Sequence, residues 1–301
     1  MYLGIEIGGT KLQLGLGQGD GRIVRLWRES VKPVEGGEGI RQQILAAVPQ
    51  LLRDAGLQAS DLRGVGIGFG GPVDDATQSV IVSHQITGWE SFPLAAWLRE
   101  KFNVPVFLGN DADVAGLAEA LIGAGRGQSP VFYITVGSGI GGGLILDGRI
   151  HRGVGRGAAE IGHLRYRDLD GRLDIVEHFA SGWGMEREAQ RFGCTWTPRE
   201  IGRLAATDPR ARQILTRAIE ALAEAICHVI TLICPQCVVI GGGVSLLGED
   251  VWFGPLREAV AQRVFRPFAG LTQIVPAALG EEVVVHGALA MARRSSENFT
   301  V

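Results

Sequence analysis

Two short glycine-rich segments of the chain carry the residue types that bind phosphate. The first is Gly8-Gly9-Thr10-Lys11 and the second is Gly137-Ser138-Gly139. A polyphosphate is bound by several converging backbone N–H groups, and glycine lets the backbone approach it closely. The hydroxyl groups add donors, and the lysine adds a positive charge. The alternative interpretation is that each segment is only a tight β-hairpin turn, where glycine pairs are common.

A third glycine run, Gly241-Gly242-Gly243, follows the apolar segment 238–240. Taken together, two related turns and a third glycine run favour a role in phosphate binding over the interpretation that the turns are only hairpin turns. The chain lacks the GxxxxGK[ST] pattern of a P-loop. It also lacks a dinucleotide fingerprint, because the first glycine turn leads into a strand and not into a helix.

A cluster of polar side chains, Asn110-Asp111-Ala112-Asp113, lies between an expected strand and an expected helix. One interpretation is structural: Asn110 or Asp111 caps the helix, and acidic residues in its first turn offset the helix dipole. The other is chemical, because the carboxyl ends of strands are where α/β folds place groups that bind ligands. The two roles can fall on neighbouring residues.

The elements that must position these residues occur twice. An apolar strand (3–7), a glycine turn and a second strand (12–16) open the chain, and the same pattern returns at 131–136 and 144–146. The similarity extends to Asp20-Gly21-Arg22-Ile23 and Asp147-Gly148-Arg149-Ile150. The repeat predicts a duplicated domain, in which each copy supplies one wall of a phosphate-binding cleft.

Further strands and helices alternate along both halves of the chain. Helical spacing is expected at 40–52, 94–102, 114–122, 211–234 and 284–292, and strands at 65–69, 104–108 and 238–240. Such alternation predicts an α/β fold with mixed sheets.

The composition excludes several classes of protein. The 301 residues suffice for two lobes, and a formal net charge of −3 gives no reason to expect nucleic acid or an anionic membrane as a partner. No signal peptide or membrane span is expected, which favours a cytoplasmic protein. Cys234 and Cys237 have the spacing of a redox motif, but they close a helix, so buried structural thiols are expected for all four cysteines.

These motifs together resemble the ROK family of sugar kinases and repressors, which has the duplicated RNase H-like fold of actin, hexokinase and Hsp70. The resemblance covers essentially the full length. It rests on the glycine segments above and on Gly71-Pro72-Val73-Asp74, Gly88-Trp89, Asn110-Asp111-Ala112, Gly137 to Gly143, Glu160-Ile161-Gly162-His163 and Ile240 to Gly243. It implies a small lobe of residues 1–112 with a C-terminal helix at about 286–301, and a large lobe of residues 113–285.

The resemblance also implies an activity: transfer of the γ-phosphate of ATP to a hexose or N-acetylhexosamine hydroxyl. Asp111 would be the general base, which takes the hydroxyl proton late in the reaction. Mg²⁺ would accompany ATP, with Glu6 as a candidate group near it, and Gly241 to Gly243 would border the adenosine. A homodimer is expected. The implied sugar-binding residues are Gly71, Gln85, Asn110, Glu160, His163 and Glu177.

The chain departs from the family pattern at three places. The cysteine-rich zinc loop of many ROK proteins is replaced by residues 164–174, which hold no cysteine, so no structural zinc is expected. His163 must then be oriented by another group, for which Asp168, Asp170 and Asp174 are candidates. Glu6 stands where the family usually has Asp. Gln85 stands where many of its kinases have Asn, so the sugar can differ from glucose.

Three rival functions follow from the same residues. A sugar-responsive repressor is not favoured, because the first strand begins at residue 2 or 3 and leaves no winged-helix domain before it. A chaperone of the Hsp70 kind is not favoured, because no length remains for a peptide-binding domain. A catalytically inactive homologue that binds sugar is the alternative that Glu6 and the missing zinc loop keep open. The sequence does not identify the sugar.

Overall fold

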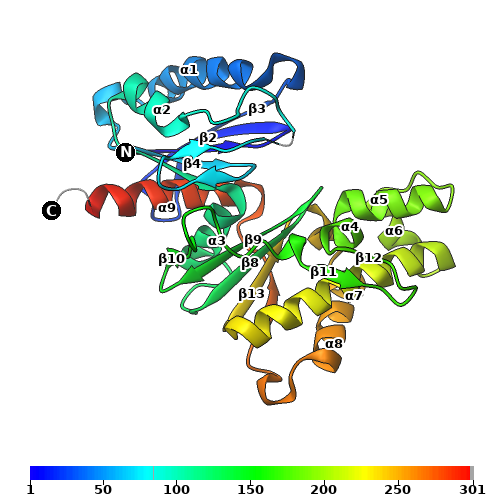
Figure 1. Ribbon diagram of the computed structural model, residues 1–301. Coiled ribbons are helices and arrows are strands. Elements are labelled where there is room, and N and C mark those ends of the chain that lie inside the picture. The colour runs from blue at the N-terminus through cyan, green and yellow to red at the C-terminus, as the bar shows by residue number, and fades with distance from the viewer. Residues whose placement is uncertain (84, 299–301) are drawn as a thin grey trace. The chain divides into compact units, whose positions relative to one another are not determined.

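The computed structural model describes residues 1–83 and 85–298, which form two compact units (Figure 1). Unit 1 comprises Met1–Arg126, Gly148–Ala158 and Leu279–Val301, and unit 2 comprises Gly127–Asp147 and Ala159–Ala278. The bounds differ from the predicted division at residue 112. Helix α3 (Asp111–Ile122) belongs to unit 1 because it packs against α9 (Val283–Asn298).

Unit 1 contains a five-stranded sheet in the order β3-β2-β1-β4-β7. Strands β1 and β2 are antiparallel, whereas β4 and β7 run parallel to β1. Its further elements are β1 (Tyr2–Ile7), β2 (Lys11–Gly17), β3 (Ile23–Ser30), β4 (Gly64–Phe69), β5 (Val73–Asp74), β6 (Ser79–Val80), β7 (Val106–Asn110), β10 (Arg149–Ile150), α1 (Gly36–Asp54), α2 (Leu94–Phe102) and the 3-10 turns Pro33–Glu35, Ala59–Asp61 and Gly280–Glu282.

Helices cover both faces of this sheet, with α1 and α2 on one face and α9 on the other (Figure 1). The strands alternate apolar residues with glycine, and the glycines face α9. A Cβ atom at Gly66 would lie 1.9 Å from the carbonyl oxygen of Ala288, and one at Gly4 would lie 2.7 Å from that of Val285. Gly287 of α9 meets the Val114 carbonyl of α3 in the same way, at 1.9 Å. These glycines therefore allow close packing of helix on backbone.

Unit 2 repeats the strand pattern of unit 1. Strands β9, β8, β13 and β14 follow one another in its sheet, with β8 and β9 antiparallel and β13 and β14 parallel to β8. Its elements are β8 (Val131–Val136), β9 (Ile140–Leu146), β11 (Arg165–Arg167), β12 (Leu173–Ile175), β13 (Cys237–Gly241), β14 (Gln273–Pro276), α4 (Glu177–Ala180), α5 (Gly182–Arg191), α6 (Pro198–Leu204), α7 (Pro209–Ile233), α8 (Gly254–Arg263), the 3-10 turns Ile161–His163, Gly243–Leu247 and Arg266–Phe268, and the π-helical turn Glu249–Phe253.

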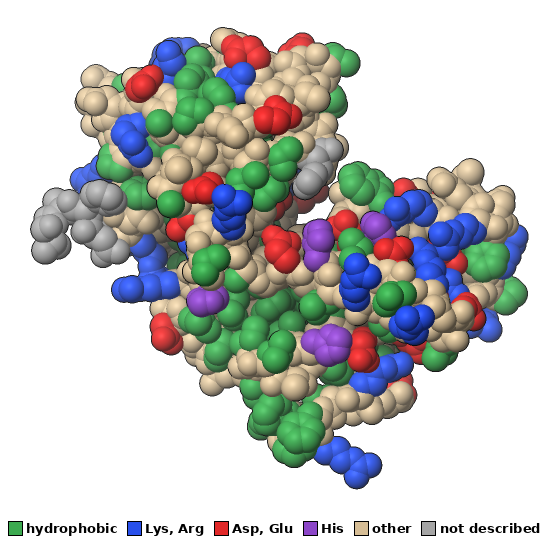
Figure 2. Space-filling model, in the orientation of Figure 1, with side chains coloured by type: hydrophobic (Ala, Val, Ile, Leu, Met, Phe, Trp, Pro, Cys, Tyr) green, Lys and Arg blue, Asp and Glu red, His purple; other side chains and the backbone are tan. Residues whose placement is uncertain are grey.

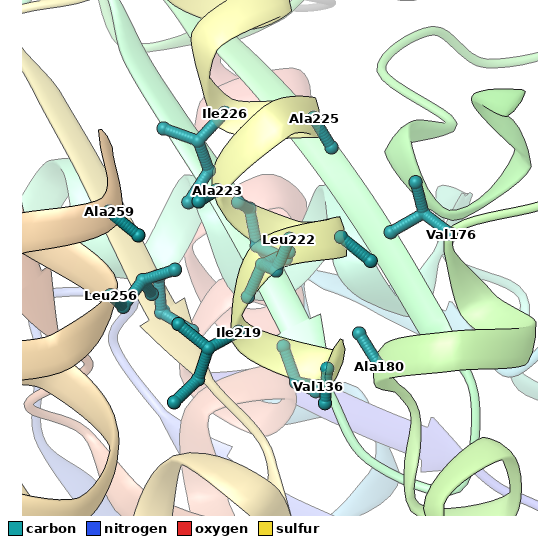
Figure 3. Packing of buried hydrophobic residues seen from close by; sticks show 14 of the residues in the cluster. Val136, Val176, Ala180, Ile219, Leu222, Ala223, Ala225, Ile226, Leu256 and Ala259 are labelled. Atoms are coloured by element: carbon teal, nitrogen blue, oxygen red, sulfur yellow. The ribbon is translucent and has the colours of Figure 1, made fainter. Parts of the chain in front are cut away.

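The long helix α7 supplies the centre of the core of unit 2. Its apolar face packs between α4 and α8 and over the sheet, and Figure 3 shows Leu222, Ile219 and Ile226 pointing into this packing. The helix begins after Asp208, whose side chain accepts a hydrogen bond from the Arg210 N–H, and it ends at Cys234, which has a left-handed backbone.

The expected elements occur within a few residues of their predicted bounds. Sequence reasoning missed β3, β14, the short two- and three-residue strands and the helices α4, α5, α6 and α8. Cys234 and Cys237 close α7 and open β13 as expected. Cys227 and Cys237 are buried, but Cys194 and Cys234 are only partly buried, so the expectation of burial is wrong for these two. Burial raises the pKa of the Cys227 thiol to about 11. None of the helices in the described part of the chain combines the length and apolar character needed to cross a bilayer.

Replacing Leu222 with alanine tests the central place of α7. Leu222 is fully buried, whereas Leu232 of the same helix is 83% exposed. We expect Leu222→Ala to lower the free energy of unfolding of unit 2 by about 2–5 kcal/mol through the lost contacts and the cavity. Leu232→Ala should change it by less than about 0.5 kcal/mol. Urea unfolding monitored by circular dichroism measures both, and equal shifts would contradict this packing.

Candidate active site

Asp111 is the first residue of α3, and the helix cap falls on its neighbour. The Asn110 side chain accepts hydrogen bonds from the N–H groups of Ala112 at 2.9 Å and Asp113 at 3.4 Å. Its amide nitrogen donates to the Gly71 carbonyl at 3.0 Å. The capping role left open between the two residues thus belongs to Asn110. One oxygen of Asp111 accepts from the Ala112 N–H at 2.8 Å.

The Asp111 carboxylate lies close to the first glycine turn. Gly70 donates its N–H to the Ile7 carbonyl at 2.8 Å, so β4 ends beside the end of β1. A Cβ atom at Gly70 would lie 3.5 Å from Asp111 Oδ2 and 3.6 Å from Gly8 Cα. The space beside Gly70 is thus within van der Waals distance of both the carboxylate and the turn, which lie close to each other.

Gln85 lies over the same turn. A Cβ atom at Gly9 would fall 1.4 Å from the side-chain oxygen of Gln85, so the amide occupies the space beside Gly9. The segment that carries Gln85 is anchored by Trp89, which is fully buried and packs edge to face on Phe69 at 5.3 Å. The Arg41 guanidinium lies over the Trp89 ring at 5.1 Å. Gly88-Trp89 therefore anchors this segment.

Glu6 is engaged by two neighbours across the first hairpin. Its carboxylate accepts a 2.6 Å hydrogen bond from Gln13 and lies 3.3 Å from the Lys11 ammonium. Lys11 and Gln13 also donate to the Glu281 carbonyl that precedes α9. Burial raises the pKa of the Glu6 carboxyl above its ordinary value, and Lys11 and Gln13 oppose the rise.

This arrangement bears on the prediction that Glu6 lies near Mg²⁺. Mg²⁺ is held by oxygen ligands in octahedral geometry and usually keeps several waters. One oxygen of Glu6 faces the Lys11 ammonium and the other accepts from Gln13. Each oxygen keeps a further lone pair, so Glu6 could still accept from a water of the ion, and its place near Mg²⁺ stays a prediction. Sequence reasoning missed Gln13, and its only local signal was a polar residue between two leucines of a strand; the pairing with Glu6 is seen in the register of β1 with β2.

The second glycine turn is bound by the start of α5 and by Glu177. The N–H groups of Gly182 and Trp183 donate to the carbonyls of Gly137 at 2.8 Å and Ser138 at 3.2 Å. Glu177 Oε2 accepts from the Ile140 N–H at 2.7 Å, and a Cβ atom at Gly139 would lie 2.6 Å from that oxygen. The structure thus brings Glu177 directly onto the turn.

The third glycine run lies beside the strand that leads into this turn. Gly242 has a left-handed φ of 87°, and a Cβ atom there would lie 2.5 Å from the Val136 backbone. A Cβ atom at Gly241 would lie 2.6 Å from the Tyr133 hydroxyl, whereas one at Gly243 would meet nothing within 4 Å. The run therefore packs tightly at its start and faces open space at its end.

Glu160 and His163 flank a short turn that packs on β9. A Cβ atom at Gly162 would lie 2.4 Å from the Ile140 carbonyl, so the turn needs glycine there. The His163 ring lies 4.0 Å from the Glu160 carboxylate, and the two side chains are 68% and 57% exposed. Both side chains are therefore open to solvent on unit 2.

The expectation that an aspartate of residues 164–174 orients His163 is wrong for the described structure. Asp174 bonds instead to the ring of His178 at 2.7 Å, and to Arg172 at 3.3 Å. Asp168 and Asp170 both pair with Arg217. The three aspartates face α4 and α7 and turn away from His163, because cationic partners on those helices attract them.

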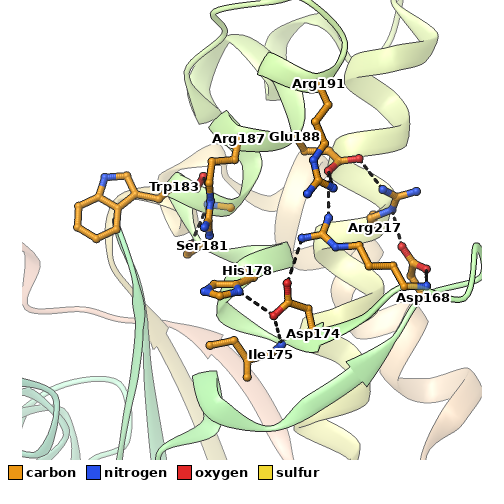
Figure 4. A network of polar contacts seen from close by, with 12 residues as sticks. Asp168, Asp174, Ile175, His178, Ser181, Trp183, Arg187, Glu188, Arg191 and Arg217 are labelled. Carbon is orange, nitrogen blue, oxygen red and sulfur yellow. Dashed lines mark hydrogen bonds and ion pairs between the residues drawn. The ribbon is translucent and has the colours of Figure 1, made fainter.

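These contacts form an ionic network that anchors the β11–β12 hairpin to α5 and α7 (Figure 4). Arg217 pairs with Glu188 at 2.5 Å and with Asp168 at 3.3 Å, and Arg172 pairs with Glu188 at 3.2 Å. The side chains of Arg217, Glu188 and Asp168 are only 14%, 11% and 3% exposed. Outside this network, Figure 2 shows basic and acidic side chains intermixed over the same part of unit 2.

Within the described residues, no group of three or more His, Cys, Asp and Glu side chains lies together in a way that could hold a metal ion. Charge pairs link the hairpin to α5 and α7, and Glu177 follows β12 after one residue, Val176.

Comparisons with known proteins decide the family. A model of the ROK family matches residues 2–295. The chain belongs to the ROK family. A glucokinase from Thermotoga maritima is 29% identical over 307 residues, 95% of each chain, and an N-acetylmannosamine kinase from Vibrio cholerae is 30% identical over 268 residues, 87% of this chain and 89% of that enzyme.

The fold of this ROK protein agrees with the family. The structure of a ROK family glucokinase from Streptomyces griseus, in complex with glucose and AMPPNP, aligns with a TM-score of 0.80 at 29% identity, covering 97% of this chain and 99% of that one. The predicted family and the predicted duplicated α/β fold are confirmed. In unit 1, Asp111 and Gln85 lie beside the glycine turn that follows β1, and in unit 2 Glu177 lies beside the turn that follows β8.

Removing Arg217 tests whether the ionic network stabilises unit 2. Arg217→Met leaves Glu188 and Asp168 buried without their main counter-charge, so we expect a loss of about 3–5 kcal/mol in the free energy of unfolding. Arg191 pairs with the same Glu188 at 3.0 Å but is 58% exposed, so Arg191→Met should cost at most about 1 kcal/mol. Chemical unfolding compares the two, and a similar small loss in both would show that the network adds little.

Proposed function

We propose that this ROK protein is an ATP-dependent sugar kinase that phosphorylates a hydroxyl of a hexose or N-acetylhexosamine. The observation that carries the proposal is the likeness, over nearly the whole chain, to the Streptomyces griseus glucokinase with its glucose and AMPPNP. The glucokinase and N-acetylmannosamine kinase relatives support both classes of sugar. The sugar-binding homologue without turnover has no comparable support.

Asp111 is proposed as the general base. Its carboxylate lies beside the first glycine turn, and Asn110 relieves it of the capping role. The carboxylate accepts a hydrogen bond from the sugar hydroxyl and takes its proton as the oxygen bonds to the γ-phosphorus. The bond between that phosphorus and the β–γ bridging oxygen breaks, and ADP leaves with the electron pair. Positioning and charge neutralisation supply most of the rate enhancement in such transfers.

The two glycine turns are proposed to bind the phosphates through their N–H groups, and Lys11 adds charge. Gly241 to Gly243 are proposed to border the adenosine, consistent with the open space at Gly243. Magnesium bound with ATP would neutralise phosphate charge. The proposed sugar contacts stay as predicted: Gly71, Gln85, Asn110, Glu160, His163 and Glu177. The homodimer and the cytoplasmic location also remain predictions.

A hexose panel tests the activity. We expect ATP-dependent ADP release with at least one of glucose, mannose, N-acetylglucosamine and N-acetylmannosamine, because these cover the two sugar classes of the relatives. A coupled ADP assay measures turnover, and calorimetry measures sugar binding in parallel. Sugar binding without any turnover across the panel would contradict the kinase proposal and assign the inactive alternative.

Asp111→Asn tests the base. The amide keeps the size of the side chain but cannot accept the proton, so kcat should fall by about 10²–10⁴. Affinity for the sugar should stay within about tenfold, because the cap on Asn110 is untouched. Asn110→Asp, which keeps an acceptor at the cap, serves as the comparison for helix stability. Comparable turnover in Asp111→Asn and the unaltered protein would remove Asp111 from this role.

A further inference from the structure

A basic pocket lies in unit 1, apart from the residues proposed for catalysis. Its volume is about 630 Å³, within the usual range for small-molecule sites. It is bounded by α3, α9 and the segment that carries β10. Four of its lining residues are arginines: Arg149, Arg152, Arg293 and Arg294.

The positive charge of this pocket is only partly neutralised. Arg152 pairs with Asp75 at 2.6 Å. Among the residues whose side chains the structure describes, 1–83 and 85–296, no ion pair involves Arg149 or Arg294, and none of the described lining residues is acidic. These two side chains together carry about two positive charges. A phosphate monoester carries about −1.5 to −2 at neutral pH, so one such group matches them.

Apolar side chains form one part of the wall, and Gly19, Gly148 and Ser295 complete it. Leu117 and Leu121 of α3, and Ala290 and Met291 of α9, line the pocket together with Ile150. A single phosphate would fill only part of this volume, so the remaining space suits the organic part of a small ester.

The walls of the pocket are continuous with the elements that hold the proposed catalytic residues. Helix α3 begins at Asp111, and Leu117 and Leu121 lie farther along it. Arg152 donates to the Leu108 carbonyl at 3.5 Å, in the strand that ends at Asn110. The turn that precedes α9 offers the Glu281 carbonyl to Lys11.

From this geometry we propose that the pocket between α3, α9 and β10 is a second ligand site, which binds a small phosphate ester through Arg149 and Arg294. Guanidinium groups bind phosphate with two parallel N–H donors each, which favours phosphate over a neutral ligand. The inference does not rest on the proposed kinase activity, because it concerns binding at different residues.

Calorimetry on the full chain tests the site. Glucose 6-phosphate and inorganic phosphate are titrated in the presence of AMPPNP and of a saturating sugar that binds in the hexose panel, so that the proposed catalytic residues are occupied. We expect saturable binding that weakens as potassium chloride is raised. Arg149→Gln with Arg294→Gln should weaken it by at least about tenfold, because two charge-assisted contacts are lost. Stronger binding of the ester than of phosphate would assign the organic part to the apolar wall, and equal binding would make phosphate itself the ligand.

Arg99→Gln with Lys101→Gln removes the same charge from exposed positions on α2 and should leave the affinity unchanged. Circular dichroism checks that the variants fold. If the double variant unfolds, the single variant Arg149→Gln, at an exposed position, is titrated in its place. Absence of saturable binding, or equal affinity in the double variant and the unaltered chain, would overturn the proposal. If glucose 6-phosphate or phosphate bound the Arg149→Gln/Arg294→Gln variant as tightly as the unaltered chain, the ligand would bind at another place, whether or not the chain is a kinase.

Discussion

The contact between α9 and the glycine face of the first sheet is the constraint on which unit 1 depends. A side chain at Gly66 or Gly4 would meet the helix backbone, so the sequence of β1 and β4 is shaped by this approach. The contact fixes the turn before α9, whose Glu281 carbonyl holds Lys11 and Gln13. Through Gly287 it also fixes α3, which begins at Asp111. The proposed base and the phosphate turn thus owe their positions to backbone contacts rather than to large side chains.

Unit 2 has the same strand arrangement as unit 1, but different contacts stabilise it. Its sheet is covered by the broad apolar face of α7, and the hairpin before Glu177 is tied down by charge pairs centred on Arg217. A buried charge network contributes little beyond an apolar alternative when it is complete, but it is costly when one partner is lost. It therefore specifies one position for the β12–α4 junction, and Glu177 reaches the Ile140 N–H from that junction.

The sequence predicted what is local and missed what joins distant segments. The glycine turns, the helix start at Asp111 and the duplicated hairpin follow from short patterns, and they lie where expected. Arg217 and Asp168 are 49 positions apart, so no short sequence pattern indicates that they pair. The sequence also did not predict that Asp174 bonds to the ring of His178 and not to that of His163. The close approach of α9 to Gly66 was not predicted either, because the sequence of a strand does not show whether its glycine faces a ligand or a helix. The contact between Glu6 and Gln13 depends on the register of β1 with β2, and the length of the turn did not determine that register.

The discontinuity of unit 1 has a consequence for the order in which the chain acquires its shape. Residues 283–298 are made after every residue of unit 2, yet they cover strands formed from the first 69 residues. During synthesis, unit 2 can therefore fold around α7 while one face of the first sheet is still uncovered. The apolar and glycine-rich face of that sheet stays exposed to wrong pairing until α9 has been made, and a chain that stopped before residue 283 would leave it uncovered.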